Sequence, residues 1–311
     1  MECMHMKKNS VPTKTTKPQD KLPDLSVVLL NYNTRDLTMK AIETVYASDR
    51  GTYSLEVILC DNASTDDIEP DVKKRFPEVI FIQNGGNVGF AGGNNPGIEK
   101  SRGRYVLLLN TDTEVAPTTL ATMLRYMDDH PDVGASTCKL LLMDGTIDPA
   151  CHRGFPTPWA AFSYYIGLEK LLPTIPLFGG YHLTHLDRTT IHEVDMISGA
   201  FFLIRRSVLT QIGLLDTDYL MYGEDMDWCM RIRRAGWKII YNPTVTILHK
   251  KKQSGRANAD RARRIRTEGM FFTYNKLFYK KNYDASYPKI VMWLVYTLFD
   301  VRILFLRTFG F

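Results

Sequence analysis

Acidic residues and one histidine follow apolar runs at positions where they could bind a metal ion. Asn110 and Asp112 come directly after the run "YVLLL" (residues 105–109), and His249 ends the run "VTIL". Carboxylate and imidazole groups are common ligands of divalent cations, whereas a buried ionised carboxylate without a partner is costly. Asp112 could equally cap a helix that starts at "TEVAP", and a lone histidine at a strand end is more often structural. The spacing alone leaves both hypotheses open.

An acidic pair follows the aromatic, glycine-containing stretch "YLMYG". Glu224 and Asp225 begin a predicted helix that ends near Gly236. Acidic residues in a first turn complement the helix dipole, and Asp227 is spaced to pair with Arg231 one turn later. A carboxylate at such a helix start could instead take a proton from a substrate hydroxyl. The composition of the helix does not separate these two roles.

Two further stretches contain residue types that suit a nucleotide. In "CDNASTDD", Asp61 could stabilise a turn, or its carboxylate could accept a hydrogen bond from the N3–H of a uracil or thymine ring. The segment 84–97, "NGGNVGFAGGNNPG", is rich in glycine and asparagine, but its glycine spacing differs from the Rossmann fingerprint. It could bring backbone N–H groups and amide side chains to a nucleotide, or it could be a tight loop that needs positive φ angles.

Short apolar runs alternate with longer amphipathic segments from Leu25 onward, and these elements must position the residues described above. The alternation predicts an α/β fold with a mainly parallel sheet that is covered on both faces. Ligands of such sheets bind beyond the carboxyl ends of the strands. Three predicted strands end in polar residues, which are expected to meet at one edge: Asn31 and Asn33, Asp61 and Asn62, and Asn110 and Asp112.

The middle of the chain, residues 150–193, is rich in proline, glycine, aromatic residues and histidine, without clear periodicity. We expect a partly ordered insertion that packs over the site as a lid. The following stretch, "VDMISGAFFLIRRSVLTQIG", is predicted to form a strand and then a helix.

The overall composition is that of an ordinary globular protein. Of 311 residues, 44% are hydrophobic and 23% charged, and a net charge of +5 is too small to indicate a nucleic-acid partner. None of the five cysteines lies at zinc-ligand spacing, so reduced thiols in a reducing compartment are expected. Residues 1–23 lack the apolar centre of a signal peptide and are predicted to be a flexible basic leader, with the catalytic part on the cytoplasmic side.

Residues 251–311 differ from the rest because basic, aromatic and apolar residues are mixed there. The run 290–299 is too short to cross a bilayer, and Asp300 and Arg302 interrupt its continuation. A buried core helix or an oligomer contact would explain this composition. It also suits an amphipathic helix in the membrane interface, which is the interpretation we favour.

Taken together and in order, these motifs resemble the inverting glycosyltransferases of family 2, which have the GT-A fold, and above all their bacterial rhamnosyltransferase-like branch. The stretches that carry the resemblance are "VVLLNYNTRD", "EVILCDNASTDD", "NVGFAGGNNPGI", "GRYVLLLNTDTEV", "VDMISGAFFLIRR", "YGEDMDWCMRIRRAGWKI" and "ILHK". They predict a GT-A domain over residues 24–250, followed by a basic linker and a helical extension over 251–311.

The resemblance implies a metal site and a catalytic base. Asp112 in "NTD" stands in the place of the family's DXD motif and would bind Mn²⁺ or Mg²⁺, with His249 closing the metal site as in some relatives. Asn110 stands where many relatives carry Asp, which leaves one negative charge fewer. Asp225 in "GED" would be the general base, with Glu224 beside it in support or in acceptor binding.

The resemblance also implies the substrates. Asp61 would hold the pyrimidine of a dTDP- or UDP-sugar, and the other residues expected to line the nucleotide-sugar site are Asn31, Asn33, Asn62, Asn87, Gly89, Phe90, Asn94, Asn110 and Thr111. The acceptor side is expected to include Ser198, Gly199 and Trp228. The implied acceptor is a hydroxyl of a glycan or lipid-linked sugar at the inner face of the cell membrane, used in cell-envelope polysaccharide assembly. A homodimer is a further option.

Two other functions are considered from the sequence. A sugar-phosphate nucleotidyltransferase would also need metal-binding carboxylates, but the early glycine-rich triphosphate loop of such an enzyme is not found. A non-catalytic nucleotide-sugar-binding subunit is slightly supported by Asn110, whereas the intact "GED" and His249 oppose it.

Overall fold

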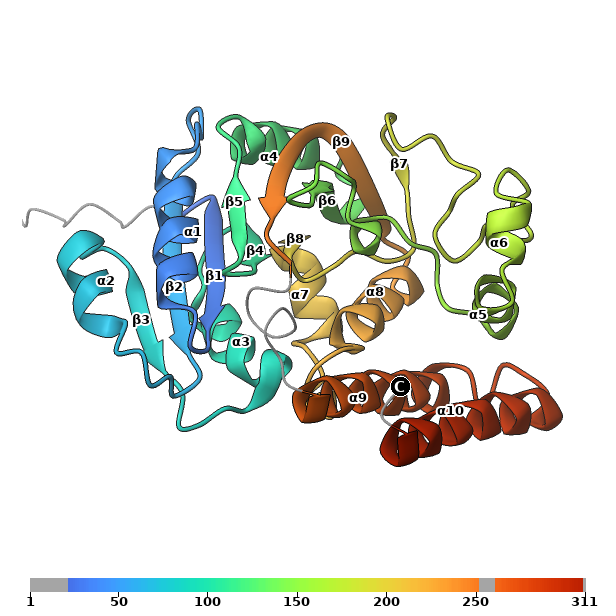
Figure 1. Cartoon of the computed structure of the whole chain (residues 1–311). Helices are drawn as coiled ribbons and strands as arrows, with labels where there is room; N and C mark the ends of the chain where they lie inside the picture. Colours follow the sequence, from blue (N-terminus) through green and yellow to red (C-terminus); the bar gives the residue numbers. More distant parts are fainter. Residues whose placement is uncertain (1–21, 252–260, 310–311) are drawn as a thin grey trace, which may run out of the picture.

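The computed structural model describes residues 22–251 and 261–309 of the chain (Figure 1). The predicted leader therefore lies almost wholly outside the described residues, as does part of the basic segment after His249. The first half alternates strands and helices in the predicted manner: β1 (Leu25–Asn31), α1 (Arg35–Ala47), β2 (Leu55–Asp61), α2 (Glu69–Arg75), β3 (Ile80–Gln83), α3 (Gly89–Lys100) and β4 (Tyr105–Leu109).

Both faces of this half of the sheet are covered. Successive strand residues point to opposite faces, yet Val27, Val28 and Leu29 are all fully buried. Helix α3 covers one face, since the backbone at Gly97 lies against the side chains of Val28 and Cys60, where a β-carbon would not fit. Burial on both faces explains why these strands read as continuous apolar runs.

The second half contains the insertion and the C-terminal helices. Its elements are β5 (Thr113–Val115), α4 (Thr119–Asp129), β6 (Val133–Leu141), the 3₁₀-helix η1 (Pro149–Cys151), α5 (Pro158–Tyr165), α6 (Leu168–Leu171), β7 (His192–Glu193), β8 (Phe201–Arg205), α7 (Arg206–Ile212), α8 (Glu224–Arg234), β9 (Lys238–His249), α9 (Arg261–Asn282) and α10 (Lys289–Phe309). The region expected to be a partly ordered lid thus carries η1 and two short helices.

One sheet joins the two halves in the order β3-β2-β1-β4-β8-β6-β9-β5, with β7 paired to β9. The strands β1 to β4 pair in parallel, as predicted. In contrast, β8 runs antiparallel to both β4 and β6, and β5 runs antiparallel to β9, so the second half of the sheet is mixed. The first half is parallel as predicted, and in the mixed second half the long strands β6 and β9 also pair in parallel.

The strand register brings polar residues together at one edge of the sheet. Asn31 at the end of β1 is in register with Asp61 at the end of β2, and Leu29 is in register with Leu109 at the end of β4. Because these strands are parallel, their polar ends share an edge. Thr113 of β5 is in register with His249, so the antiparallel pair β5–β9 carries the histidine to the residues after β4.

The helices α9 and α10 lie side by side below the sheet domain (Figure 1). Lys276 of α9 forms an ion pair with Asp300 of α10 at 2.7 Å. Among the residues that the structure describes, no helix is both long and apolar enough to span a bilayer.

Candidate active site

Asp112 lies in the short connection between β4 and β5. The helix that Asp112 was expected to cap begins only at Thr119, because residues Thr113–Val115 form β5 instead. The helix-cap hypothesis for Asp112 is therefore wrong, as is a helix start at Thr113 or Glu114. The backbone carbonyl of Asp112 accepts a hydrogen bond from the N–H of Lys250 at 2.8 Å, which ties the connection to the end of β9.

His249 lies between two carboxylates. Its Nε2 is 3.4 Å from Oδ1 of Asp112, and its Nδ1 is 2.8 Å from Oδ2 of Asp148. Burial alone would lower the pKa of His249, but the hydrogen bonds and charges of the two carboxylates outweigh it and raise the pKa to about 9. With about 5% of Asp112 and of His249 exposed, these groups meet almost without solvent.

Asp148 was not predicted from the sequence. It is fully buried just before η1, and its carboxylate also accepts hydrogen bonds from Lys251 Nζ at 2.8 Å and from the N–H of Ala150 at 3.0 Å. Burial would raise the pKa of Asp148, but these donors and His249 outweigh burial and hold the pKa below its usual range. Asp148 therefore stays ionised and fixes the orientation of the imidazole.

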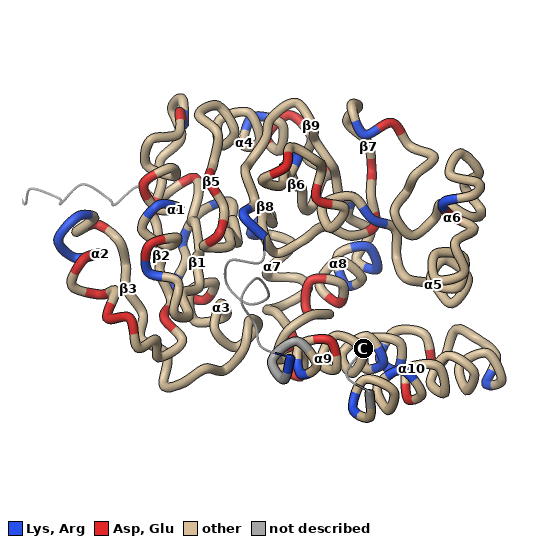
Figure 2. Tube along the Cα trace, viewed as in Figure 1, with Lys and Arg blue, Asp and Glu red and all other residues tan. Residues whose placement is uncertain are grey.

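A backbone turn positions the acidic pair at the start of α8. Tyr222 has φ +72° and Gly223 has φ +97°, both in the left-handed region, so the chain turns sharply before Glu224. Figure 2 shows the acidic residues at the start of α8 and basic residues directly after β9. Asp227, one turn into the helix, pairs with Arg231 at 2.8 Å, which confirms that ion pair.

The two carboxylates of the pair have different surroundings. Glu224 is 7% exposed, and its Oε2 has no hydrogen-bond partner among the described residues. Burial, together with the neighbouring charge of Asp225, raises the pKa of Glu224 to about 8, so this carboxyl is protonated at neutral pH. Asp225 faces the guanidinium of Arg153, with 3.5 Å between its Oδ2 and Nη2. Arg153 lies in the insertion and was not predicted.

Asp61 sits at the end of β2 in a network of donors. Oδ1 accepts from Asn31 Nδ2, and Oδ2 accepts from the N–H of Ser64 and from Gln83 Nε2, each at 2.8 Å. Burial would raise the pKa of Asp61, but these hydrogen bonds lower it below its usual range. With 2% of the residue exposed, Asp61 has little surface for a nucleotide base, and pyrimidine recognition by it stays a prediction.

Asn31 lies in a buried hydrogen-bond network, and its contact with the nucleotide stays a prediction. The residue has no exposed surface, and its Oδ1 accepts hydrogen bonds from the hydroxyl groups of Thr34 and Thr38. The hydroxyl of Thr111 lies 3.1 Å from that of Thr34, which connects this network to the residues after β4. Asn33, by contrast, is exposed, and its Oδ1 accepts from the N–H of Thr65 at 2.8 Å.

The loop before α3 is held by amide side chains. Asn62 Nδ2 donates to the carbonyl of Gly89 at 3.0 Å, and Asn87 Oδ1 accepts from the N–H of Gly89 at 3.2 Å. Asn94 Nδ2 donates to the carbonyl of Phe90 at 2.9 Å. Asn62 and Asn94 are each 2% exposed, so they hold the loop from the interior of the protein.

Gly89 is the residue of this loop with the least tolerance for a side chain. Its φ is +79°, and a β-carbon would collide with the carbonyl oxygen of Leu220. We expect Gly89→Ala to lower the free energy of unfolding by about 1–3 kcal/mol and to weaken nucleotide binding. Thermal unfolding with and without UDP measures both effects.

Gly85→Ala is the matched control, because a β-carbon at Gly85 meets nothing within 4 Å. Equal thermal midpoints for the two variants would contradict the assignment of Gly89 as a conformational requirement of the loop.

Two of the three residues expected on the acceptor side lie in the interior of the molecule. Trp228 is fully buried, its indole N–H donates to the carbonyl of Gly213 at 3.0 Å, and its ring packs on Phe202. This face of α8 lies in the core, and contact of Trp228 with the acceptor stays a prediction. Gly199 is buried, and a β-carbon on it would come within 2.9 Å of the ring of Phe90. Ser198 is partly exposed, and its hydroxyl accepts from the N–H of Ala200 at 3.2 Å.

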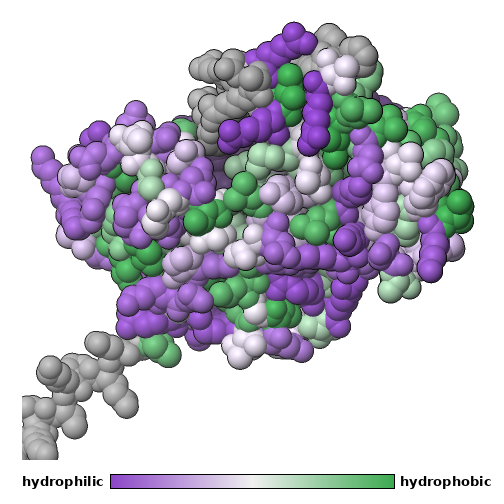
Figure 3. All heavy atoms as spheres, turned by 90° about the horizontal axis from the view of Figure 1, so that it is seen from below, coloured by the Kyte–Doolittle hydropathy of each residue, from purple (hydrophilic) through white to green (hydrophobic). Residues whose placement is uncertain are grey.

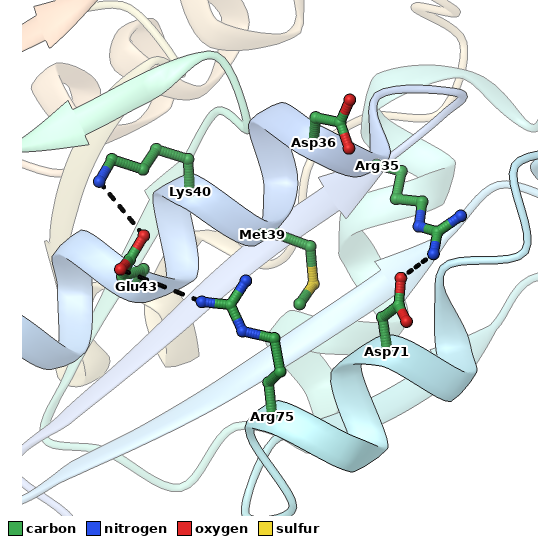
Figure 4. A pocket seen from close by; sticks show the side chains of 7 residues that line it. All are labelled: Arg35, Asp36, Met39, Lys40, Glu43, Asp71 and Arg75. Carbon is green, nitrogen blue, oxygen red and sulfur yellow. Dashed lines mark hydrogen bonds and ion pairs between the residues drawn. The ribbon is translucent and has the colours of Figure 1, made fainter.

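A surface hollow of about 360 Å³ lies between α1 and α2 and contains none of the candidate residues (Figure 4). Charged residues dominate it, and several pair with each other: Arg35 with Asp71, and Glu43 with both Lys40 and Arg75. Since its charges are largely compensated, we assign the site from the polar strand ends and from α8. The seven residues that line the hollow are Arg35, Asp36, Met39, Lys40, Glu43, Asp71 and Arg75.

Comparisons with known proteins identify the family of the chain. The family model described as "Glycosyltransferase like family 2" matches residues 23–267. An N-acetylglucosaminyl-diphospho-decaprenol L-rhamnosyltransferase of Mycobacterium tuberculosis is 28% identical over 211 residues, covering 64% of this chain and 68% of the relative. The rhamnosyltransferase WbbL of Escherichia coli is 22% identical over 271 residues, covering 83% and 96% of the two chains.

The fold is also that of solved glycosyltransferases. The mannosyltransferase PcManGT of Pyrobaculum calidifontis, solved with GDP-Man and Mn²⁺, superposes with a TM-score of 0.58 at 19% identity, covering 94% of this chain and 72% of its own. That likeness concerns the GT-A fold, while the family match rests on the sequence. The chain therefore belongs to glycosyltransferase family 2 and is a glycosyltransferase.

Proposed function

We propose that the protein transfers a hexose, rhamnose or a similar sugar, from a dTDP- or UDP-sugar to a hydroxyl of a lipid-linked glycan, with inversion at the anomeric carbon and with the help of a divalent cation. The observation that carries this proposal is that Asp112, after β4, lies against His249 at the end of β9. The segment 148–153 contacts both His249, through Asp148, and Asp225, through Arg153. The names of the relatives support the sugar and the lipid-linked acceptor, since one is a rhamnosyltransferase that acts on a diphospho-decaprenol.

The residues at the end of β9 fit a divalent cation. Asp112 and His249 would contribute a carboxylate oxygen and Nε2, which lie 3.4 Å apart. Asp148 on Nδ1 is the outer partner that a metal-binding histidine usually has. Among the described residues no group of three or more His, Cys, Asp or Glu could hold an ion, so substrate phosphate and water would complete the shell of Mn²⁺ or Mg²⁺. A bound cation would offset negative charge on the leaving diphosphate.

Asp225 is the proposed general base. Its Oδ2 takes the proton of the acceptor hydroxyl while the acceptor oxygen forms a bond to the anomeric carbon. The bond from that carbon to the nucleoside diphosphate breaks on the opposite face, which gives inversion. Glu224 is unsuited to this step at neutral pH, because its raised pKa of about 8 keeps it protonated. Its buried, neutral carboxyl would serve as a hydrogen-bond donor.

Product analysis with a small set of donors tests the proposed function. We expect transfer from dTDP-rhamnose or UDP-glucose to a short-chain N-acetylglucosaminyl-diphospho-lipid in the presence of Mn²⁺, and loss of transfer with EDTA. Pyrophosphate release from a nucleoside triphosphate and a sugar phosphate would instead indicate the nucleotidyltransferase. Donor binding without transfer or hydrolysis under all conditions would indicate the non-catalytic subunit.

We further propose that α10 contacts anionic lipids at the inner face of the cell membrane, where a lipid-linked acceptor would be found. Seven large apolar side chains recur along one side of α10 every three or four residues and are 43–65% exposed; these define the α10 stripe: Ile290, Trp293, Leu294, Leu298, Val301, Leu304 and Phe305. Figure 3 shows hydrophobic residues beside strongly hydrophilic ones on this side of the molecule.

Exposed basic residues on the same helix complement the apolar stripe. Lys289, Arg302 and Arg307 are exposed, so the helix combines apolar insertion with attraction to anionic lipid. Met292 and Leu306 are buried, which shows that α10 also packs on the protein.

Leu298→Asp is expected to weaken binding to vesicles that contain phosphatidylglycerol at least about tenfold, since burying a leucine contributes about 1.5–3 kcal/mol. Co-sedimentation measures the binding. Met143→Asp is the matched control, because Met143 and Leu298 are both 65% exposed and Met143 lies outside α10. Equal binding of wild-type and Leu298→Asp would contradict membrane contact by the stripe, and dissociation of a dimer by this change would assign the stripe to self-association.

A further inference from the structure

Arg153 of the insertion holds the proposed base from one side. Its Nη2 lies 3.5 Å from Oδ2 of Asp225, and only 14% of the arginine side chain is exposed. The other carboxylate oxygen, Oδ1, accepts a hydrogen bond from the N–H of Met226 at 2.8 Å. The carboxylate is thus fixed by a backbone donor on its own helix and by a guanidinium from a distant segment.

The backbone of Arg153 is itself anchored. Its carbonyl accepts hydrogen bonds from the N–H groups of Asp195 and Met196, at 3.1 and 2.9 Å, and its Nε donates to the carbonyl of Ala150 at 3.2 Å. The guanidinium therefore has little freedom to follow a moving partner. An arginine held in this way sets where the opposing carboxylate lies.

The charges around Asp225 explain why an arginine is needed there. The other titratable groups near it are Glu224 and Cys229 on α8, and neither supplies a positive charge. Burial would lower the pKa of Arg153, but the charge of Asp225 is the first of the effects that outweigh burial and raise it. Arg153 is thus the positive charge that faces Asp225.

The short segment that contains Arg153 also contains a residue that contacts His249. Asp148, which orients His249, lies five residues before Arg153, and only the 3₁₀-helix η1 separates them. The carboxylate of Asp148 accepts from the N–H of Ala150, and the Nε of Arg153 donates to the carbonyl of Ala150. Ala150 is thus hydrogen-bonded to the side chains of both Asp148 and Arg153.

We propose that Arg153 is a positioning residue for the transfer reaction: it holds the Asp225 carboxylate directed at the acceptor, and the segment 148–153 fixes the base relative to His249. This inference rests on the proposed function, in which Asp225 is the base. The insertion then has a defined part in catalysis that its irregular sequence does not indicate.

The test compares Arg153→Gln with wild type over a range of pH, using dTDP-rhamnose, Mn²⁺ and the short-chain lipid acceptor. We expect kcat to fall at least about tenfold at pH 7, with the donor KM within twofold. The acid side of the pH–rate profile should also change, because the variant lacks the positive charge that faces the base. Arg153→Lys should return the profile toward that of wild type. An unchanged profile with a raised donor KM would overturn the proposal and make Arg153 a donor-binding residue.

Arg188→Gln is the matched control, since Arg188 lies in the same insertion and donates to the carbonyl of His182. It should leave the profile unchanged. If Arg153→Gln does not fold, Arg153→Lys still decides: a lower kcat at constant donor KM supports positioning, and a raised donor KM opposes it. Full activity of Asp225→Asn would reject the base itself, whereas an inactive Asp225→Asn beside a normal Arg153→Gln would reject this inference alone.

Discussion

Replacement of Asp225 by Asn is expected to reduce sugar transfer by a factor of about 10²–10⁴, the usual contribution of a general base. The amide keeps the shape of the side chain but does not take the proton of the acceptor hydroxyl. Donor affinity should stay within about twofold, because the proposed place of the nucleotide is at the polar strand ends rather than at α8. Steady-state transfer kinetics and calorimetric titration of UDP with Mn²⁺ measure the two quantities separately.

Asp227→Asn is the matched control for this variant. Asp227 lies in the same first turn, but its carboxylate pairs with Arg231 and faces Asn282, away from Arg153. The control should lower the thermal midpoint and retain the transfer rate per folded molecule. Comparable activity of Asp225→Asn and Asp227→Asn would exclude Asp225 as the base.

Replacement of Asp112 by Ala is expected to weaken metal-dependent donor binding at least about a hundredfold, since loss of even an outer partner of a metal ligand costs 10–100-fold. The change removes the carboxylate that faces His249 Nε2 at 3.4 Å. Calorimetry of UDP binding with and without Mn²⁺ should show that the metal-linked gain in affinity disappears. Binding in EDTA should be unaffected.

Glu114→Ala is the control for Asp112→Ala. Glu114 lies two residues further along the chain, in β5, where its carboxylate pairs with Lys250. Loss of this partly exposed pair is expected to change little. An equal loss of Mn²⁺-linked affinity in both variants would mean that charge near β5, rather than direct coordination, explains the effect.

The sequence contained enough information for the architecture of the first half. Runs such as Tyr105–Leu109, buried at all five positions, are typical of central parallel strands, and their polar ends predict one shared edge. The antiparallel β8 and β5 could not be predicted in the same way. Pairing direction depends on connections that fold through the insertion, where no periodic pattern marks the path of the chain.

The differences between the predicted and the observed surroundings of the site residues have a common physical origin. Trp228 and Asn31 were assigned to ligand contact from their places in motifs, yet both have no exposed surface. A motif gives residue order, whereas the direction in which a side chain points depends on tertiary packing. Arg153 and Asp148 were missed for the opposite reason: they lie in an irregular segment, and only the fold brings them to Asp225 and His249.

The most direct test of the account is a crystal structure with Mn²⁺ and dTDP or UDP, in which anomalous scattering at the manganese edge locates the ion. We predict one strong peak bonded to Asp112 and His249 and to the diphosphate, with Oδ2 of Asp225 facing the sugar side. A peak at another place in the chain, or nucleotide bound away from the ends of β1, β2 and β4, would contradict it.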